Sequence, residues 1–269
     1  MNTEKKFSSI IKNLLKEYDI ACAFLQGSQN YNLDTLNSDI DVKVFVLPKF
    51  SDIYNGTKIS KTIETKYGLA EIKDIRQLPM LIKKGNPSYI EIVFSPYNYY
   101  LPELNIMINN LLSKYYFNKL ELVEKHRLRI LLACGGMAKQ KYAALFKLSE
   151  ARRKDIEAHG YSLKDYHHLM RLYFMIKDMV EFYKPFNEVL TFNTGIQKLL
   201  ISAKKFPIEV SEVAENSKAM IGRIDRMVDN FTNSFKRNDV EYLVKPLEEA
   251  IEILIKRSIK KEIEEGDDV

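Results

Sequence analysis

Two short polar segments near the start of the chain carry residue types that can handle phosphate and divalent metal. Gly27 and Ser28 directly follow the apolar run DIACAFLQ, and the segment SDID begins ten residues after Ser28. A Gly-Ser pair where a strand gives way to a helix presents backbone N–H groups and a hydroxyl that can cradle phosphate oxygens. We therefore expect Gly27 and Ser28 to contact the phosphates of a nucleotide.

Asp39 and Asp41 are spaced for a divalent-cation site. The run DIDVKVFVLP alternates apolar and polar residues, which predicts a strand with Asp39, Asp41 and Lys43 on one face. Residues two apart on a strand project to the same side, so both carboxylates can grip cations together. Glu71, on the polar face of the alternating run LAEIKDI, completes a three-carboxylate cluster if the two strands are neighbours. Such hard oxygen ligands favour Mg²⁺, with Mn²⁺ as a substitute.

A carboxylate cluster beside a phosphate cradle suits nucleotidyl transfer. One metal would hold the phosphates of a nucleoside triphosphate (NTP) such as ATP, and a second would lower the pKa of the attacking hydroxyl. The third carboxylate would accept or orient the hydroxyl proton, and pyrophosphate would leave. Taken singly, a Gly-Ser pair is usually a turn and an Asp-x-Asp pair a solvated strand edge. The ordered combination is what makes the pattern specific.

The segments GSQNYNL and SDIDVKVFV resemble the active-site motif of the DNA polymerase β-like nucleotidyltransferase superfamily. The similar branch comprises bacterial and phage nucleotidyltransferases with the pattern GS-x-x-YGL followed by SD-x-D. The run IRQLPMLIKKGNPSYIEIVFS, with Asn86, Pro87 and Glu91, resembles the same branch, so the likeness spans residues 20–95. It implies a mixed sheet flanked by helices and a set of site residues: phosphate contacts at Gly27 and Ser28, metal ligands at Asp39 and Asp41, and a third carboxylate at Glu71.

Two positions depart from this pattern. The family more often has Asp near the third carboxylate, which makes Asp74 an alternative to Glu71, although strand alternation favours Glu71 because Asp74 would share the face of Ala70 and Ile72. Asn32 stands where the family usually has Gly. Because Asn tolerates left-handed backbone better than other non-glycine residues, we expect the turn to survive.

A basic stripe in the second half of the chain is a further candidate. Lys164, His168 and Arg171 in SLKDYHHLMRLY are four and three residues apart, which places them on one helix face. The resemblance extends to this helix, where it implies a contribution to the nucleotide pocket. Lys or Arg there would neutralise triphosphate charge, and His168 would bond phosphate or ribose. The alternative is a solvated helix face with a half-buried His168.

Other features allow weaker interpretations. Tyr97, Tyr99 and Tyr100 could stack nucleic-acid bases, but packing between two domains is at least as good an explanation. Arg153 and His159 have a spacing found in helical RNase domains, which suggests metal-independent RNA cleavage as a minor hypothesis.

Composition sets the broad class. The 269 residues are 46% hydrophobic and 29% charged, with a net charge of +5, which is typical of a folded protein and compatible with acidic partners. Cys22 and Cys134 sit among apolar or small residues, as expected for buried thiols in a reducing compartment. Neither a signal peptide nor a membrane-spanning run is evident, so the sequence predicts a cytoplasmic protein that does not enter a membrane.

The predicted fold class is α+β, with a small mixed-sheet nucleotidyltransferase domain over residues 1–100 and an all-α domain over residues 101–269. Periodicity predicts strands within DIACAFLQ, DIDVKVFVLP and LAEIKDI, a weakly patterned segment 58–66, and a run at 89–95 that is strand or helix. A hinge between the two parts is expected over residues 96–102, which are rich in Tyr, Asn and Pro. Helices are predicted at 7–17, 75–84, 103–113, 117–148, 162–183, 196–204, 208–235 and 239–263.

The function expected from the motifs is Mg²⁺-dependent transfer of a nucleoside monophosphate to a hydroxyl. The acceptor is open: an RNA 3′ end such as that of tRNA, a protein side chain as in antitoxin-like members, or a small molecule such as an aminoglycoside. The alternative is a non-catalytic module that binds nucleotide or RNA.

Overall fold

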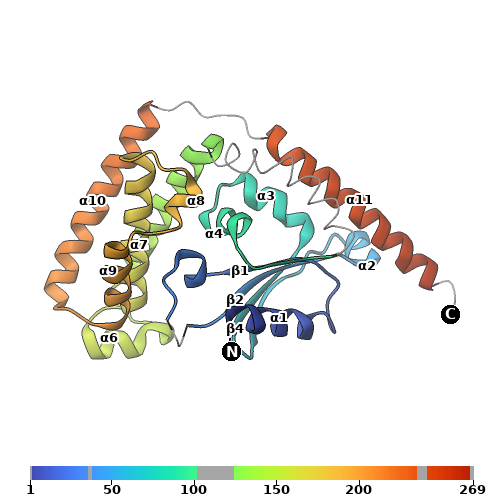
Figure 1. Cartoon of the computed structure of the whole chain (residues 1–269), viewed down its shortest axis with the longest axis horizontal. Helices are drawn as coiled ribbons and strands as arrows, with labels where there is room; N and C mark the ends of the chain where they lie inside the picture. The colour runs from blue at the N-terminus through green and yellow to red at the C-terminus, as the bar shows by residue number, and fades with distance from the viewer. Residues whose placement is uncertain (1, 36–37, 102–123, 235–240, 267–269) are drawn as a thin grey trace.

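The computed structural model describes residues 2–35, 38–101, 124–234 and 241–266 of the chain (Figure 1). The N-terminal part forms a five-stranded mixed sheet and the rest is mostly helical, which confirms the α+β class. The strands are β1 (Ile20–Gln26), β2 (Asp41–Val46), β3 (Ser60–Thr65), β4 (Gly68–Asp74) and β5 (Asn98–Tyr100). Their order across the sheet is β3-β4-β2-β1-β5.

Strand register brings the motif-bearing ends together. β1 and β2 are antiparallel with Gln26 opposite Asp41, and β2 and β4 are parallel with Val42 opposite Ala70. The end of β1 and the beginnings of β2 and β4 therefore meet at one end of the sheet.

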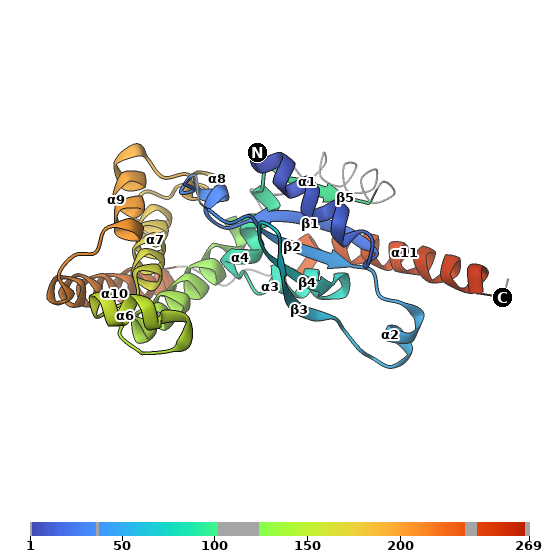
Figure 2. The same ribbon diagram turned by 90° about the horizontal axis from the view of Figure 1, so that it is seen from below.

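The two faces of the sheet differ as the alternation predicts. Val42, Val44 and Ile72 are buried against α1 (Thr3–Leu14), which lies along one face of the sheet (Figure 2). The opposite face carries Phe45 and is covered by the short helices α3 (Leu78–Lys83) and α4 (Pro87–Ile90). Apolar residues on a strand thus sort by period two into separate clusters.

In three segments the structure either differs from the prediction or decides between a strand and a helix. The weakly patterned segment 58–66 forms β3, which is mostly exposed and lies at the sheet edge. Residues 89–95 are helical, in α4 and the 3-10 turn η3 (Glu91–Phe94). Where a hinge was expected, β5 instead pairs with β1.

The helical part begins, within the described residues, with a helix over 124–144. It continues with the following helices: α6 (Arg153–His159), α7 (Leu163–Val180), α8 (Phe186–Val189), α9 (Thr194–Lys205), α10 (Val210–Ser234) and α11 (Glu241–Gly266). The predicted helix 103–113 and the start of 117–148 lie outside the described residues. No helix in the described ranges combines the length and apolar character needed to cross a membrane.

One hydrophobic cluster joins the two parts. It contains Phe24 and Ile90 from the sheet part together with Leu169 and Met175 from α7. The predicted boundary at residue 100 is thus bridged by a shared core. Cys22 and Cys134 also belong to this cluster and are free thiols, and burial raises the pKa of both, that of Cys134 to about 12.

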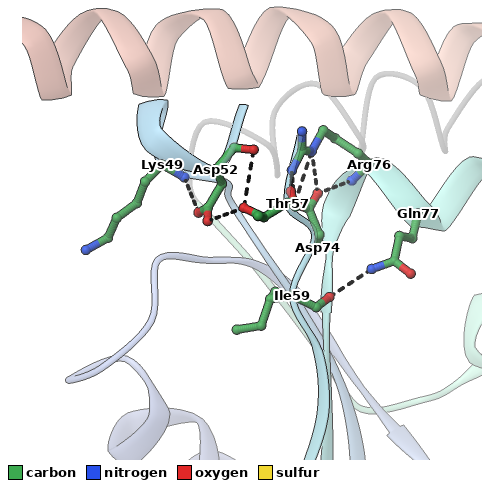
Figure 3. Close-up of polar contacts among 7 residues, drawn as sticks. All are labelled: Lys49, Asp52, Thr57, Ile59, Asp74, Arg76 and Gln77. Carbon is green, nitrogen blue, oxygen red and sulfur yellow. Dashed lines mark hydrogen bonds and ion pairs between the residues drawn. The ribbon is translucent and has the colours of Figure 1, made fainter. Parts of the chain in front are cut away.

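The opposite end of the sheet is fixed by a polar network around the loop that contains α2 (Phe50–Tyr54) (Figure 3). Arg76 donates to Asp74 and to the carbonyl of Thr57, at 2.6 and 2.5 Å from Nη2, and Gln77 donates to the carbonyl of Ile59. These bonds anchor the return of the loop into β3.

A substitution in the β3–β4 turn can test how tightly the backbone packs at the end of the sheet where the Gly27 turn and the start of β2 meet. A Cβ on Gly68 would lie 2.5 Å from the carbonyl oxygen of Ile40, so Gly68→Ala must displace backbone. We expect a loss of about 1–3 kcal/mol in the free energy of unfolding measured with urea. Gly136→Ala is the control, since a Cβ there meets nothing within 4 Å and Ala favours a helix. Equal stability of the two variants would contradict this packing.

Candidate functional site

The Gly27 turn closes β1. Gly27 has a φ of +93°, and Ser28–Tyr31 form the single 3-10 turn η1 where the sequence predicted the start of a helix. Asn32 follows with φ 53° and ψ 36°, so the prediction of a left-handed backbone at this position is confirmed. The first N–H groups of a helical turn have no partner within the turn and remain available to a ligand.

The Asp41 carboxylate lies between two turns. Its Oδ1 accepts the backbone N–H of Leu69 at 2.9 Å, which ties it to the β3–β4 turn. Its Oδ2 lies on the side of the Gly27 turn, where a Cβ on Gly27 would be 3.8 Å away. The Gly27 turn and Asp41, which come from the two motifs found in the sequence, are therefore adjacent in space.

Asp39 lies just outside β2. It precedes β2, which begins at Asp41, but burial still alternates across this segment, with Ile40 in the same buried cluster as Val42 and Val44. Its carbonyl accepts from Gln29 Nε2 at 2.7 Å, which fastens the segment to the Gly27 turn. Its side chain is exposed and lines an open cleft at this end of the sheet.

The Glu71 carboxylate is paired with lysine side chains. It shares a sheet face with Asp41, but it is ion-paired with Lys43, lies 3.3 Å from Lys73 Nζ, and accepts from the Tyr89 hydroxyl at 2.7 Å. Burial acts to raise the pKa of Glu71, but the hydrogen bond and charge of Lys43 and the bond from Tyr89 outweigh it, and the pKa lies below its usual value. Lys43 is 4% exposed, and burial lowers its pKa against the opposing effect of Glu71.

The predicted three-carboxylate cluster is not assembled. Among the described residues, no group of three Asp, Glu, His or Cys side chains is placed to share a metal ion. Asp74, the alternative third carboxylate, lies opposite Val46 at the far end of β2 and is held by Arg76 (Figure 3). What the structure offers a divalent cation is Asp41, one oxygen of which faces the Gly27 turn, with Asp39 nearby in sequence.

A buried acid connects the Gly27 turn to the helical part. Glu91 is 4% exposed and accepts hydrogen bonds from the Tyr31 hydroxyl and the backbone N–H of Gly27. The Arg171 guanidinium of α7 lies over the Tyr31 ring, 4.1 Å from its centroid. Burial raises the pKa of Glu91 to about 7, although Arg171 and Gly27 act to lower it.

The three residues of the predicted basic stripe on α7 differ in burial and charge. Arg171 reaches the Gly27 turn through Tyr31, and its buried Nε has no hydrogen-bond partner among the described residues. Burial and the charge of Arg171 lower the pKa of His168 to about 2, so this imidazole is neutral at pH 7. Lys164, one turn earlier, is exposed.

The helical RNase hypothesis gains no support from placement. Arg153 and His159 are the first and last residues of α6, six positions apart. At 3.6 residues per turn, this spacing places them on faces about 120° apart. The pair therefore does not form a common site on its own helix.

Several residues of this region were not predicted as site residues. Lys43 and Tyr89 pair with Glu71, while Tyr31 and Glu91 pair with each other. A signal existed for Lys43, because it lies on the polar face of an otherwise buried strand and needs a counter-charge there. Nothing in the sequence indicated that Tyr31 and Glu91, sixty positions apart, would bond.

Comparison with known proteins does not identify the chain. A scan against models of protein families finds no match, and neither does a search of curated proteins.

The raised pKa of Glu91 predicts a pH dependence of stability. Because the folded state holds the proton up to a pH of about 7 while the unfolded chain releases it near 4.5, stability falls as pH rises between these values. The loss is at most about 3 kcal/mol in unfolding free energy. Glu91→Gln should flatten this slope in urea melts from pH 4.5 to 8, whereas Glu17→Gln, at an exposed position, should keep it. Parallel slopes for the two variants would refute the assignment.

Proposed function

We propose that the protein transfers a nucleoside monophosphate from an NTP to a hydroxyl acceptor. The observation that carries the proposal is the position of the Asp41 carboxylate directly beside the Gly27 turn. A carboxylate next to a glycine turn can hold a cation where phosphate oxygens approach backbone N–H groups. The likeness to the polymerase β-like nucleotidyltransferases points to the same chemistry.

The phosphates would lie between the Gly27 turn and α7. The Gly27 N–H is donated to Glu91, so the backbone donor of the turn would be Ser28, and the unpartnered Arg171 Nε supplies a charged N–H close to the turn. An orphaned buried guanidinium N–H is costly, so an anionic ligand would relieve it. Lys164 is exposed about two helical turns from Arg171 and can add charge to the outer phosphates, while neutral His168 can bond phosphate or ribose.

Two of the three predicted carboxylates suit Mg²⁺ or Mn²⁺. Asp41 and Asp39 would hold the ion, which when bound supplies positive charge to the reacting phosphate. Glu71 is different, because Lys43 and Lys73 already balance its charge. It can become a third ligand only if Lys43 moves away.

The reaction forms one bond to the α-phosphorus and breaks another. The acceptor oxygen forms a bond to the α-phosphorus, the bond from the α-phosphorus to the bridging oxygen of the β-phosphate breaks, and pyrophosphate leaves with that electron pair. The hydroxyl proton passes to solvent. Arg171 and the Gly27 turn would stabilise the charge that develops on the leaving pyrophosphate.

One observation favours a second candidate, a module that binds nucleotide without turnover. The ion pairs of Glu71 and the lack of a three-acid group among the described side chains are what a site without a second metal would show. Calorimetric binding of NTP with no pyrophosphate release would identify this case.

The partners beyond NTP are also proposals. The net charge of +5 suits an RNA 3′ end, while a protein hydroxyl and a small molecule are the other acceptor classes. The two buried free thiols suit the reducing cytoplasm as its location.

The proposal is tested by transfer of label from α-³²P-labelled NTPs with Mg²⁺ and a mixture of tRNA, total RNA and cell protein. Asp41→Asn should reduce transfer by about 100-fold or more, because it removes the carboxylate charge. Asp34→Asn is the matched control, since Asp34 is exposed in the same segment. If the wild type transfers label and Asp41→Asn transfers equally well while melting at the same temperature, the assignment of Asp41 is wrong.

A further inference from the structure

Lys43 places a buried positive charge among the predicted metal ligands. It lies two residues after Asp41 on β2, so both side chains project from the same face of the sheet. Strand register puts Lys43 directly opposite Glu71 of β4, with which its ammonium is ion-paired. Asp41 also attracts this ammonium electrostatically. A cation of the protein itself is therefore next to two of the three carboxylates that the sequence assigns to metal ions.

The neighbours of the Lys43 ammonium hold it in one place. Its Nζ lies over the Tyr89 ring, 4.2 Å from the ring centroid, and Tyr89 donates its hydroxyl to Glu71 at 2.7 Å. A carboxylate oxygen and the face of an aromatic ring both favour positive charge. Since the side chain of Lys43 is only 5% exposed, its charge is fixed relative to Asp41 on the same sheet face.

Both oxygens of Glu71 already have partners. Oε2 is paired with Lys43, while Oε1 accepts from Tyr89 and lies 3.3 Å from Lys73 Nζ. A metal ion bound to Glu71 would displace these partners and would lie beside the Lys43 ammonium. Repulsion between two cations at such short range is strong away from bulk water. The arrangement therefore disfavours a metal ion at Glu71 for as long as Lys43 stays in place.

Stability alone does not explain the pair of Lys43 and Glu71. Removing two charges from water costs free energy, and the attraction between them often returns no more than apolar side chains of similar volume would give. A positive charge at this position matters more for what the adjoining carboxylates can bind.

We propose that the Lys43 ammonium takes the place of a second metal ion, so that the site holds a single divalent cation at Asp41. This inference rests on the proposed function, which assigns the metal ion to Asp41 beside the Gly27 turn. Lys43 is then a positioning residue, because it supplies fixed positive charge to this sheet face and keeps Glu71 from becoming a ligand. The site differs in this respect from the two-metal arrangement that the three carboxylates predict.

The test measures the affinity of the full-length chain for Mn²⁺ alone, from the electron paramagnetic resonance signal of free Mn²⁺. Lys43→Met removes the ammonium and keeps an unbranched side chain of similar length. Glu71 can then join Asp41 as a ligand, and we expect Mn²⁺ to bind about tenfold more tightly than to the wild type. A merely structural role for Lys43 would not give this gain, because a loosened site binds metal more weakly.

Two further variants show whether the gain depends on Glu71. Lys73→Met is the matched control, since it removes the same charge near the same carboxylate, and its loss should raise the affinity by no more than about twofold. The double variant Lys43→Met with Glu71→Gln replaces the pair by neutral side chains. Its affinity for Mn²⁺ should return to within about twofold of the wild type.

Either of two results overturns the inference. One is equal Mn²⁺ affinity, or no binding, in both Lys43→Met and Lys73→Met. The other is a double variant that binds Mn²⁺ about tenfold or more below the wild type, because Glu71 would then already be a ligand. This second comparison does not require that Lys43→Met fold. Since no measurement here needs NTP, absence of label transfer together with the expected Mn²⁺ affinities would overturn only the proposed reaction.

Discussion

The placement of the Asp41 carboxylate is the constraint on which the site depends. One oxygen is held by the backbone N–H of Leu69, and the other faces the Gly27 turn. This position requires that β2 run antiparallel to β1 and parallel to β4, because only then do the Gly27 turn, the start of β2 and the start of β4 meet. The sheet topology thus brings two segments that are separate in sequence together at one end of the sheet.

The helical part is coupled to this surface through a buried acid. Glu91 binds the Gly27 N–H and the Tyr31 hydroxyl, and Arg171 of α7 covers the Tyr31 ring. The shared hydrophobic core holds α7 against the sheet part, so Arg171 does not have to be ordered when a ligand arrives. Preorganised charge of this kind is effective at a phosphate because it is already oriented and partly shielded from water. A proton on Glu91 near neutral pH would alter the charge balance beneath the turn.

Local patterns predicted much of this arrangement. Alternation in β2 and β4 gave the correct faces for Val42, Lys43 and Glu71, because one side of each strand is buried against α1. The left-handed Asn32 followed from side-chain chemistry. Only the start of β2 differs, because the strand begins two residues later than the alternating run suggests. The pairing of Glu71 with Lys43, and of Tyr31 with Glu91, depends on strand order and long-range packing, which local periodicity does not contain. The GS–DxD pairing succeeded because both segments lie at ends of adjacent strands.

The central claim is that nucleoside triphosphate binds between the Gly27 turn, Asp41 and α7. Amide hydrogen exchange of the full chain, with and without NTP and Mg²⁺, tests it without knowledge of the acceptor. The account predicts slower exchange in residues 27–33 and 39–42 when both are present, and loss of this protection in Asp41→Asn. Unchanged exchange in these segments, or protection confined to another region such as the cleft between α7, α9 and α10, would contradict it.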